Sequence, residues 1–92
     1  QAVYLTRAEL GRILTVYGRH VAAGEWRDYG IATLKDEAIF AVYRRTSEAP
    51  LYSIIKTPAL RNKQGMWRIV SMSGQILKRG HDLEALLTFF SK

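Results

Sequence analysis

The 92-residue chain has no cysteine, which excludes disulfides and zinc sites built on thiolates. A chain without cysteine fits a reducing compartment, and we expect a cytoplasmic protein. No apolar run approaches the roughly 18 residues that span a bilayer, and no signal-peptide pattern is present, so we expect no membrane association. The chain begins at Gln1 rather than at methionine, so the sequence leaves open what precedes this residue.

Acidic residues are scarce in one long part of the sequence. The formal net charge is +6, and residues 44–79 carry eight basic side chains against one acidic residue, Glu48. Residues 1–43, by contrast, balance five basic with five acidic side chains. Such a basic block raises the local concentration of anions and favours nucleic acid, a phosphorylated ligand or an acidic partner. A solvated surface that keeps the protein soluble explains the same block equally well.

What the chain does contain is the composition of an ordinary globular domain. Hydrophobic residues make up 48% of it and charged residues 24%. This length suffices for one core without a metal or a disulfide. The sequence shows no repeat, low-complexity segment or linker, so we expect a single domain over residues 1–92.

Two stretches have the periodicity of amphipathic helices. Thr6 and Glu9 have the spacing of a capping box, and Gly24 supplies a stop, so the spacing predicts a first helix between them. Its apolar stripe consists of Leu10, Ile13, Leu14, Tyr17 and Val21. A second helix is predicted near the end of the chain, with Asp82 or His81 as its N-cap. Its stripe consists of Leu83, Leu86, Leu87 and Phe90.

Five strands are predicted between these helices, over residues 29–34, 37–45 (with the apolar part at 38–43), 51–56, 66–72 and 75–78. The loops between them are short, and Ser73-Gly74 has the pattern of a two-residue hairpin turn, so consecutive strands must be antiparallel neighbours. In the second strand the residues that point to either side are apolar, which is typical of the centre of a sheet that is covered on both faces. The sequence therefore predicts an α+β fold, an antiparallel meander of about five strands with an N-terminal and a C-terminal helix packed on it.

The stretch Lys78-Arg79-Gly80-His81-Asp82 stands where a strand runs into a helix. Free N–H groups at a helix start, together with cationic side chains, hold phosphate or carboxylate groups. Asp82 is itself an anion and can cap the same N–H groups, so ordinary capping is the competing interpretation. No Walker-type or dinucleotide-type glycine pattern accompanies the stretch.

A second candidate is the run of basic residues with aromatic residues between them. Basic side chains and stacking rings on one sheet face are a common means of binding single-stranded nucleic acid. Parity speaks against one continuous platform, because Arg44 and Arg45 point to opposite faces of a strand. Together the two candidates give a predicted anion- or nucleic-acid-binding set: Arg44, Arg45, Lys56, Arg68, Lys78, Arg79 and His81.

The sequence gives little support for catalysis. The only histidines, His20 and His81, lie far apart, and no cluster of residues has the spacing of metal ligands. We therefore expect a protein that is not an enzyme and that carries no metal or cofactor. Two functions stay open. The first is an anion- or nucleic-acid-binding module that uses residues 44–79, and the second is a homodimer or protein-interaction domain with no ligand of its own.

Four stretches of the chain carry a resemblance to a known family: Gly24-Glu-Trp-Arg-Asp-Tyr29, Ala41-Val-Tyr-Arg-Arg-Thr46, Pro50-Leu-Tyr52 and Ile76-Leu-Lys-Arg-Gly-His-Asp-Leu83. On these residues the chain resembles domain-of-unknown-function family 2794, a family of short alphaproteobacterial proteins. The resemblance covers about Val3 to Leu87. It implies a small bacterial, cytoplasmic protein, and it transfers no site, because no activity or ligand is established for that family.

Overall fold

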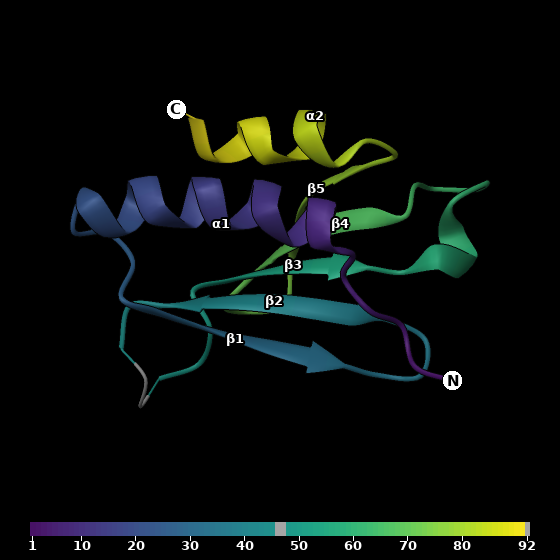
Figure 1. The fold of residues 1–92 in the computed structure, drawn as a ribbon, viewed down its shortest axis with the longest axis horizontal. Helices are drawn as coiled ribbons and strands as arrows, with labels where there is room; N and C mark the ends of the chain where they lie inside the picture. Colours follow the sequence, from purple (N-terminus) through teal and green to yellow (C-terminus); the bar gives the residue numbers. More distant parts are fainter. Residues whose placement is uncertain (46–47, 92) are drawn as a thin grey trace.

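The computed structural model describes residues 1–45 and 48–91. In these residues a helix, five strands and a short second helix follow one another, as the sequence predicts (Figure 1). The elements are α1 (Arg7–Ala22), β1 (Asp28–Thr33), β2 (Ala38–Tyr43), β3 (Tyr52–Lys56), β4 (Trp67–Ser71), β5 (Ile76–Gly80) and α2 (Leu83–Leu87), with the 3-10 turns η1 (Pro58–Leu60) and η2 (Thr88–Ser91).

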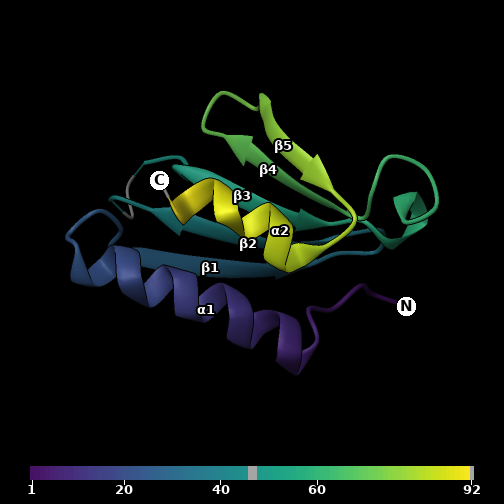
Figure 2. The same ribbon diagram turned by 90° about the horizontal axis from the view of Figure 1, so that it is seen from above.

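The five strands form one antiparallel sheet in the order β1-β2-β3-β4-β5, which confirms the predicted meander. Both helices lie on the same face of the sheet (Figure 1), and the sheet twists so that β4 and β5 run at an angle to β1 (Figure 2). We call the side under α1 and α2 the helix face and the opposite side the open face. Residues that are paired in register point to the same side, so the register assigns strand residues to these faces.

α1 begins where the capping box predicts. The Thr6 hydroxyl accepts a hydrogen bond from the Glu9 backbone N–H (3.1 Å), and the Glu9 carboxylate accepts one from the Thr6 N–H (2.8 Å). The helix ends just before Gly24, also as predicted. The buried stripe differs from the prediction, because Val16 is buried and Val21 is exposed. The cause is α2, which packs beside α1 and covers the flank that carries Val16.

The hydrophobic core fills the space between the helix face and the two helices. Phe40, Ile54 and Ile69 are register neighbours on β2, β3 and β4, and all three are fully buried under the helices. The predicted C-terminal stripe is buried at each of its positions, Leu83, Leu86, Leu87 and Phe90. Asp82 is the N-cap of α2, as predicted, and its carboxylate accepts a hydrogen bond from the Ala85 N–H (2.9 Å).

The prediction that β2 is the centre of a doubly covered sheet is wrong. The middle strand is β3, and the helices cover β2 on one face only. The second apolar parity of β2, formed by Ile39, Ala41 and Tyr43, lies on the open face. The apolar pattern of β2 is therefore only half explained by packing against the helices.

The turn between β4 and β5 has three residues rather than the predicted two. The Ser71 N–H donates to the Gln75 carbonyl (2.8 Å), and the Gly74 N–H donates to the Ser71 carbonyl (2.9 Å). Gly74 closes this loop with a φ of +89°, a value that glycine adopts without strain. A three-residue loop with its last residue left-handed is a common hairpin connection, whereas a two-residue loop at Ser73-Gly74 would need the left-handed conformation at Ser73.

Candidate functional site

The fold separates the seven predicted binding residues instead of gathering them on one surface. Lys56 lies on the helix face and is 8% exposed. Its ammonium group donates to the Tyr4 carbonyl (2.8 Å) and to the Glu9 carboxylate (2.8 Å). These two bonds tie β3 to the start of α1, so the charge of Lys56 is used inside the domain.

Lys78 also makes its hydrogen bonds to groups within the domain. It pairs with Ile69 on the helix face of β5, and its ammonium group donates to the Ala85 carbonyl (2.9 Å) and to the Thr88 hydroxyl (2.9 Å). The bond to Ala85 satisfies a carbonyl at the end of α2, where a cation is also favoured by the helix dipole.

Arg68 and Arg79 are register partners on the open face. Arg68 donates to the Thr57 hydroxyl (2.7 Å) and to the Glu37 carboxylate (3.2 Å). Arg79 has a different environment, because its Nη1 is buried and has no hydrogen-bond partner among the described residues. Lys78 and Arg79 thus point to opposite faces, and the stretch from Lys78 to Asp82 does not gather its cations around the start of α2.

His81 and Arg45 complete the outer part of the predicted set. His81 is exposed, and its Nδ1 lies 3.2 Å from the Arg61 carbonyl, to which it must donate because a carbonyl only accepts. Arg45 is exposed in the segment that follows β2. Neither side chain shares a cavity with another member of the predicted set among the described residues.

Arg44 lines a cavity together with several aromatic rings. It follows β2 with the parity of Phe40 and Val42, on the helix side of the chain. The cavity has a volume of about 390 Å³, and we call it the aromatic cavity. Its walls are His20, Glu25, Trp26, Arg44, Leu51, Tyr52, Phe89 and Phe90.

The rings of this cavity hold one another in place. The Trp26 indole stacks on the His20 ring with 4.1 Å between centroids and meets the Phe90 ring edge-on at 5.1 Å. Tyr52, at the start of β3, meets Phe90 at 5.2 Å. Aromatic pairs with these offsets and tilts are favourable beyond their burial. The cavity therefore has rigid walls contributed by α1, the segment after it, β3 and η2.

His20 holds the Glu25 carboxylate at one wall of the cavity. Its Nδ1 lies 2.5 Å from a Glu25 carboxylate oxygen, and its Nε2 lies 3.0 Å from the Phe90 carbonyl. Arg44 is the arginine of the lining, and no described residue forms an ion pair or hydrogen bond with it.

Sequence reasoning found Arg44 but missed His20, Glu25 and Trp26 as cavity residues. These residues stand on both sides of the predicted helix stop at Gly24, and only the chain reversal there brings them together. A signal was available in the resemblance, because three of its four stretches supply cavity residues. The stretch from Gly24 to Tyr29 supplies Glu25 and Trp26, and the others supply Arg44, Leu51 and Tyr52.

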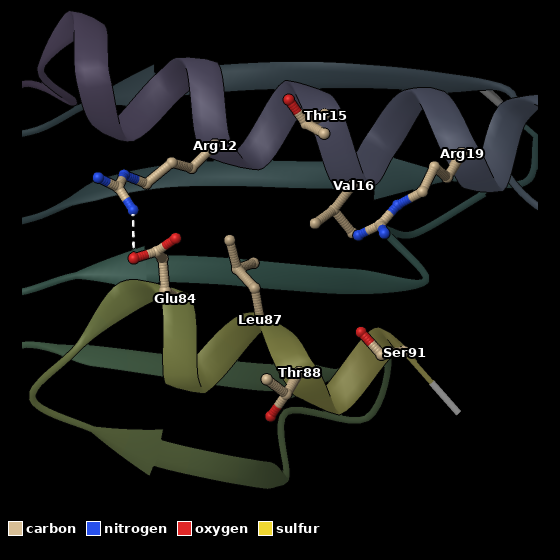
Figure 3. A pocket seen from close by; sticks show the side chains of 8 residues that line it. All are labelled: Arg12, Thr15, Val16, Arg19, Glu84, Leu87, Thr88 and Ser91. Carbon is tan, nitrogen blue, oxygen red and sulfur yellow. Dashed lines mark ion pairs between the residues drawn. The ribbon is translucent and has the colours of Figure 1, made fainter.

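A second cavity, of about 380 Å³, lies between α1 and α2, and we call it the helix groove. Figure 3 shows Arg12 and Glu84 meeting at one end, Arg19 at the other, and Val16 and Leu87 between them. The Arg12–Glu84 ion pair (2.5 Å) joins the two helices. Its other walls carry the hydroxyl residues Thr15, Thr88 and Ser91, and no aromatic ring among the described residues lines the groove.

Within residues 1–45 and 48–91 there is no cluster of three or more histidine or acidic side chains that is placed to hold a metal ion. Neither helix described is long and apolar enough to cross a membrane.

Comparison with known proteins identifies a family and nothing narrower. Searches of curated proteins and of solved structures gave no match. One family model, described as "Protein of unknown function (DUF2794)", matches residues 3–87, which is most of the chain and agrees with the resemblance. The chain therefore belongs to the family of proteins of unknown function DUF2794.

Proposed function

We propose that this domain is a non-enzymatic anion-binding module and that its binding site is the aromatic cavity. The position of Arg44 carries the proposal: its guanidinium has no ion pair or hydrogen bond to a described residue, while His20 and Glu25 satisfy each other. A guanidinium presents paired N–H donors that match the two oxygens of a carboxylate or phosphate. A cavity of about 390 Å³ falls in the range of small-molecule sites.

The walls of the cavity favour a ligand with a flat ring. Tyr52 and Phe89 are half-buried in its walls, in front of the buried rings of Trp26 and Phe90, and aromatic surfaces of this kind stack with or abut an aromatic group. Arg44 supplies the charge that binds the anionic end of such a ligand. The ligand class that fits both features is a small aromatic carboxylate.

The wider version of the proposal is a nucleic-acid-binding surface over residues 44–79, and the geometry supports it less. Binding along a strand needs a continuous row of cations. Lys56 and Lys78 donate to groups inside the domain, and Arg68 is paired with Glu37 on the other face. A homo-oligomeric or protein-interaction domain without a ligand of its own is the remaining alternative.

Calorimetric titration with indole-3-acetate tests the proposal, with neutral indole as the control compound. We expect indole-3-acetate to bind and Arg44→Gln to weaken it by about tenfold to a hundredfold, since a charged hydrogen bond contributes about 1.5–3 kcal/mol. Arg45→Gln is the matched control, because it removes an equal charge one residue away, outside the cavity, and we expect no change.

The cavity proposal would be contradicted if Arg44→Gln and Arg45→Gln lost the same affinity for indole-3-acetate. It would also be contradicted if the wild-type protein did not bind this carboxylate. Titration with a labelled single-stranded oligonucleotide tests the wider version of the proposal, in which nucleic acid binds over residues 44–79. If nucleic acid binds with a logarithmic salt slope much steeper than about −0.7, more than one phosphate is neutralised and the binding surface extends beyond Arg44.

A further inference from the structure

The aromatic cavity holds an acidic side chain as well as the arginine on which the proposed function rests. Glu25 and Arg44 both line it, and they form no ion pair with each other among the described residues. The side chain of Glu25 is 57% exposed, so a ligand that enters the cavity can reach its carboxylate. The cavity therefore offers a ligand one cationic and one acidic group that do not cancel each other.

Glu25 is held in a fixed position by its backbone and by its side chain. Gly24, at a φ of +78°, reverses the chain after α1, and the Glu25 N–H donates to the His20 carbonyl (2.9 Å). The Glu25 Oε1 lies 2.5 Å from the His20 Nδ1. The His20 ring stacks in turn on Trp26, with 4.1 Å between centroids. A group that is fixed before the ligand arrives loses little conformational freedom on binding it.

The pairing with His20 leaves Glu25 with unused hydrogen-bonding capacity. A carboxylate has two oxygens and about four acceptor positions. His20 engages Oε1, and no described residue donates to Oε2. An ammonium group carries three donors and a positive charge, so it matches the remaining oxygen of Glu25.

A simple aromatic carboxylate uses only half of this arrangement. Its anionic end binds Arg44, but the same end meets Glu25 as a like charge. A simple aromatic amine has the opposite mismatch, because its ammonium group suits Glu25 and is repelled by Arg44. A zwitterion satisfies both residues, and an α-amino acid carries a carboxylate and an ammonium group on one carbon atom.

We infer that the ligand of the aromatic cavity is a free aromatic amino acid. Arg44 binds its carboxylate, Glu25 binds its ammonium group, and the half-buried rings of Tyr52 and Phe89 contact its side chain. The inference rests on the proposed function, since it uses the same cavity and the same arginine, and it adds Glu25 as the residue that determines specificity. A residue at either end of a peptide carries only one of the two charges, so the free amino acid is the form that fits.

Calorimetric titration with four indole compounds tests which charges the cavity recognises. Tryptophan carries both charges, N-acetyltryptophan and indole-3-acetate carry only the carboxylate, and tryptophanamide carries only the ammonium group. We expect tryptophan to bind the wild-type protein at least about threefold more tightly than each of the others. The advantage is modest because solvent screens an exposed ion pair.

The variant Glu25→Gln separates recognition from support of the cavity wall. The amide oxygen still accepts a hydrogen bond from His20, while the charge is lost. We expect tryptophan to bind this variant about threefold to tenfold more weakly, and indole-3-acetate to bind it equally well or more tightly, because a like charge is removed. Asp36→Asn is the matched control, since it removes a charge from the exposed turn between β1 and β2, outside the cavity, and should change neither affinity. Circular dichroism confirms that each variant is folded.

The outcomes distinguish this inference from the proposed function. If indole-3-acetate binds through Arg44 but tryptophan binds no more tightly than N-acetyltryptophan, the proposed function stands and the inference is wrong. Equal losses of both ligands in Glu25→Gln would also overturn it, because Glu25 would then only support the cavity wall. If neither compound binds the wild-type protein, the proposed function fails and the inference fails with it.

Discussion

At the scale of single residues, Lys56 keeps its charge beneath α1 because two oxygens meet it there. Its ammonium group donates to the Tyr4 carbonyl and the Glu9 carboxylate, and Glu9 also caps the helix start. Lys56→Met keeps the packed stem but leaves both acceptors without this donor. We expect the free energy of unfolding to fall by about 1–3 kcal/mol in urea denaturation.

Lys63→Met is the control for this prediction. Lys63 is exposed in the polar turn before β4, so the change should stay within about 0.5 kcal/mol. If the two variants lose the same stability, the bonds of Lys56 contribute nothing beyond a surface charge. The comparison also bears on the basic block, because a structural Lys56 is one fewer cation for any ligand.

At the scale of elements, the turn before β4 packs closely against the end of β5 at Gly65, where only glycine fits. Its φ is +105°, and a Cβ added there would lie 2.5 Å from the Gly80 carbonyl oxygen. Gly65→Ala should therefore destabilise the domain by more than about 1 kcal/mol. Gly11→Ala makes the same change in the exposed middle of α1, where a Cβ meets nothing within 4 Å, and should stabilise by up to about 1 kcal/mol. Thermal unfolding monitored by circular dichroism measures both; effects of the same sign would contradict this account.

The elements also show where sequence reasoning succeeds and where it stops. The capping box at Thr6, the stop at Gly24 and the stripe from Leu83 to Phe90 are local patterns, and the structure confirms each of them. The side of the sheet that the helices cover is not a local property, because β2 is apolar at both parities. The aromatic cavity is not a local property either, although three stretches of the resemblance supply residues of its walls. Its walls come from positions between His20 and Phe90 that only the fold brings together.

At the scale of the whole molecule, the aromatic cavity and the bonds of Lys56 lie at opposite ends of α1. His20, in the last turn of α1, lines the cavity with Arg44, whereas Lys56 binds Glu9 in the first turn. Effects at separated sites without shared partners usually add to within about 0.3–0.5 kcal/mol. The double variant Arg44→Gln/Lys56→Met should therefore combine the weakened indole-3-acetate binding of the first change with the lower free energy of unfolding of the second. Calorimetry and urea denaturation of the wild type, the two single variants and the double variant check this.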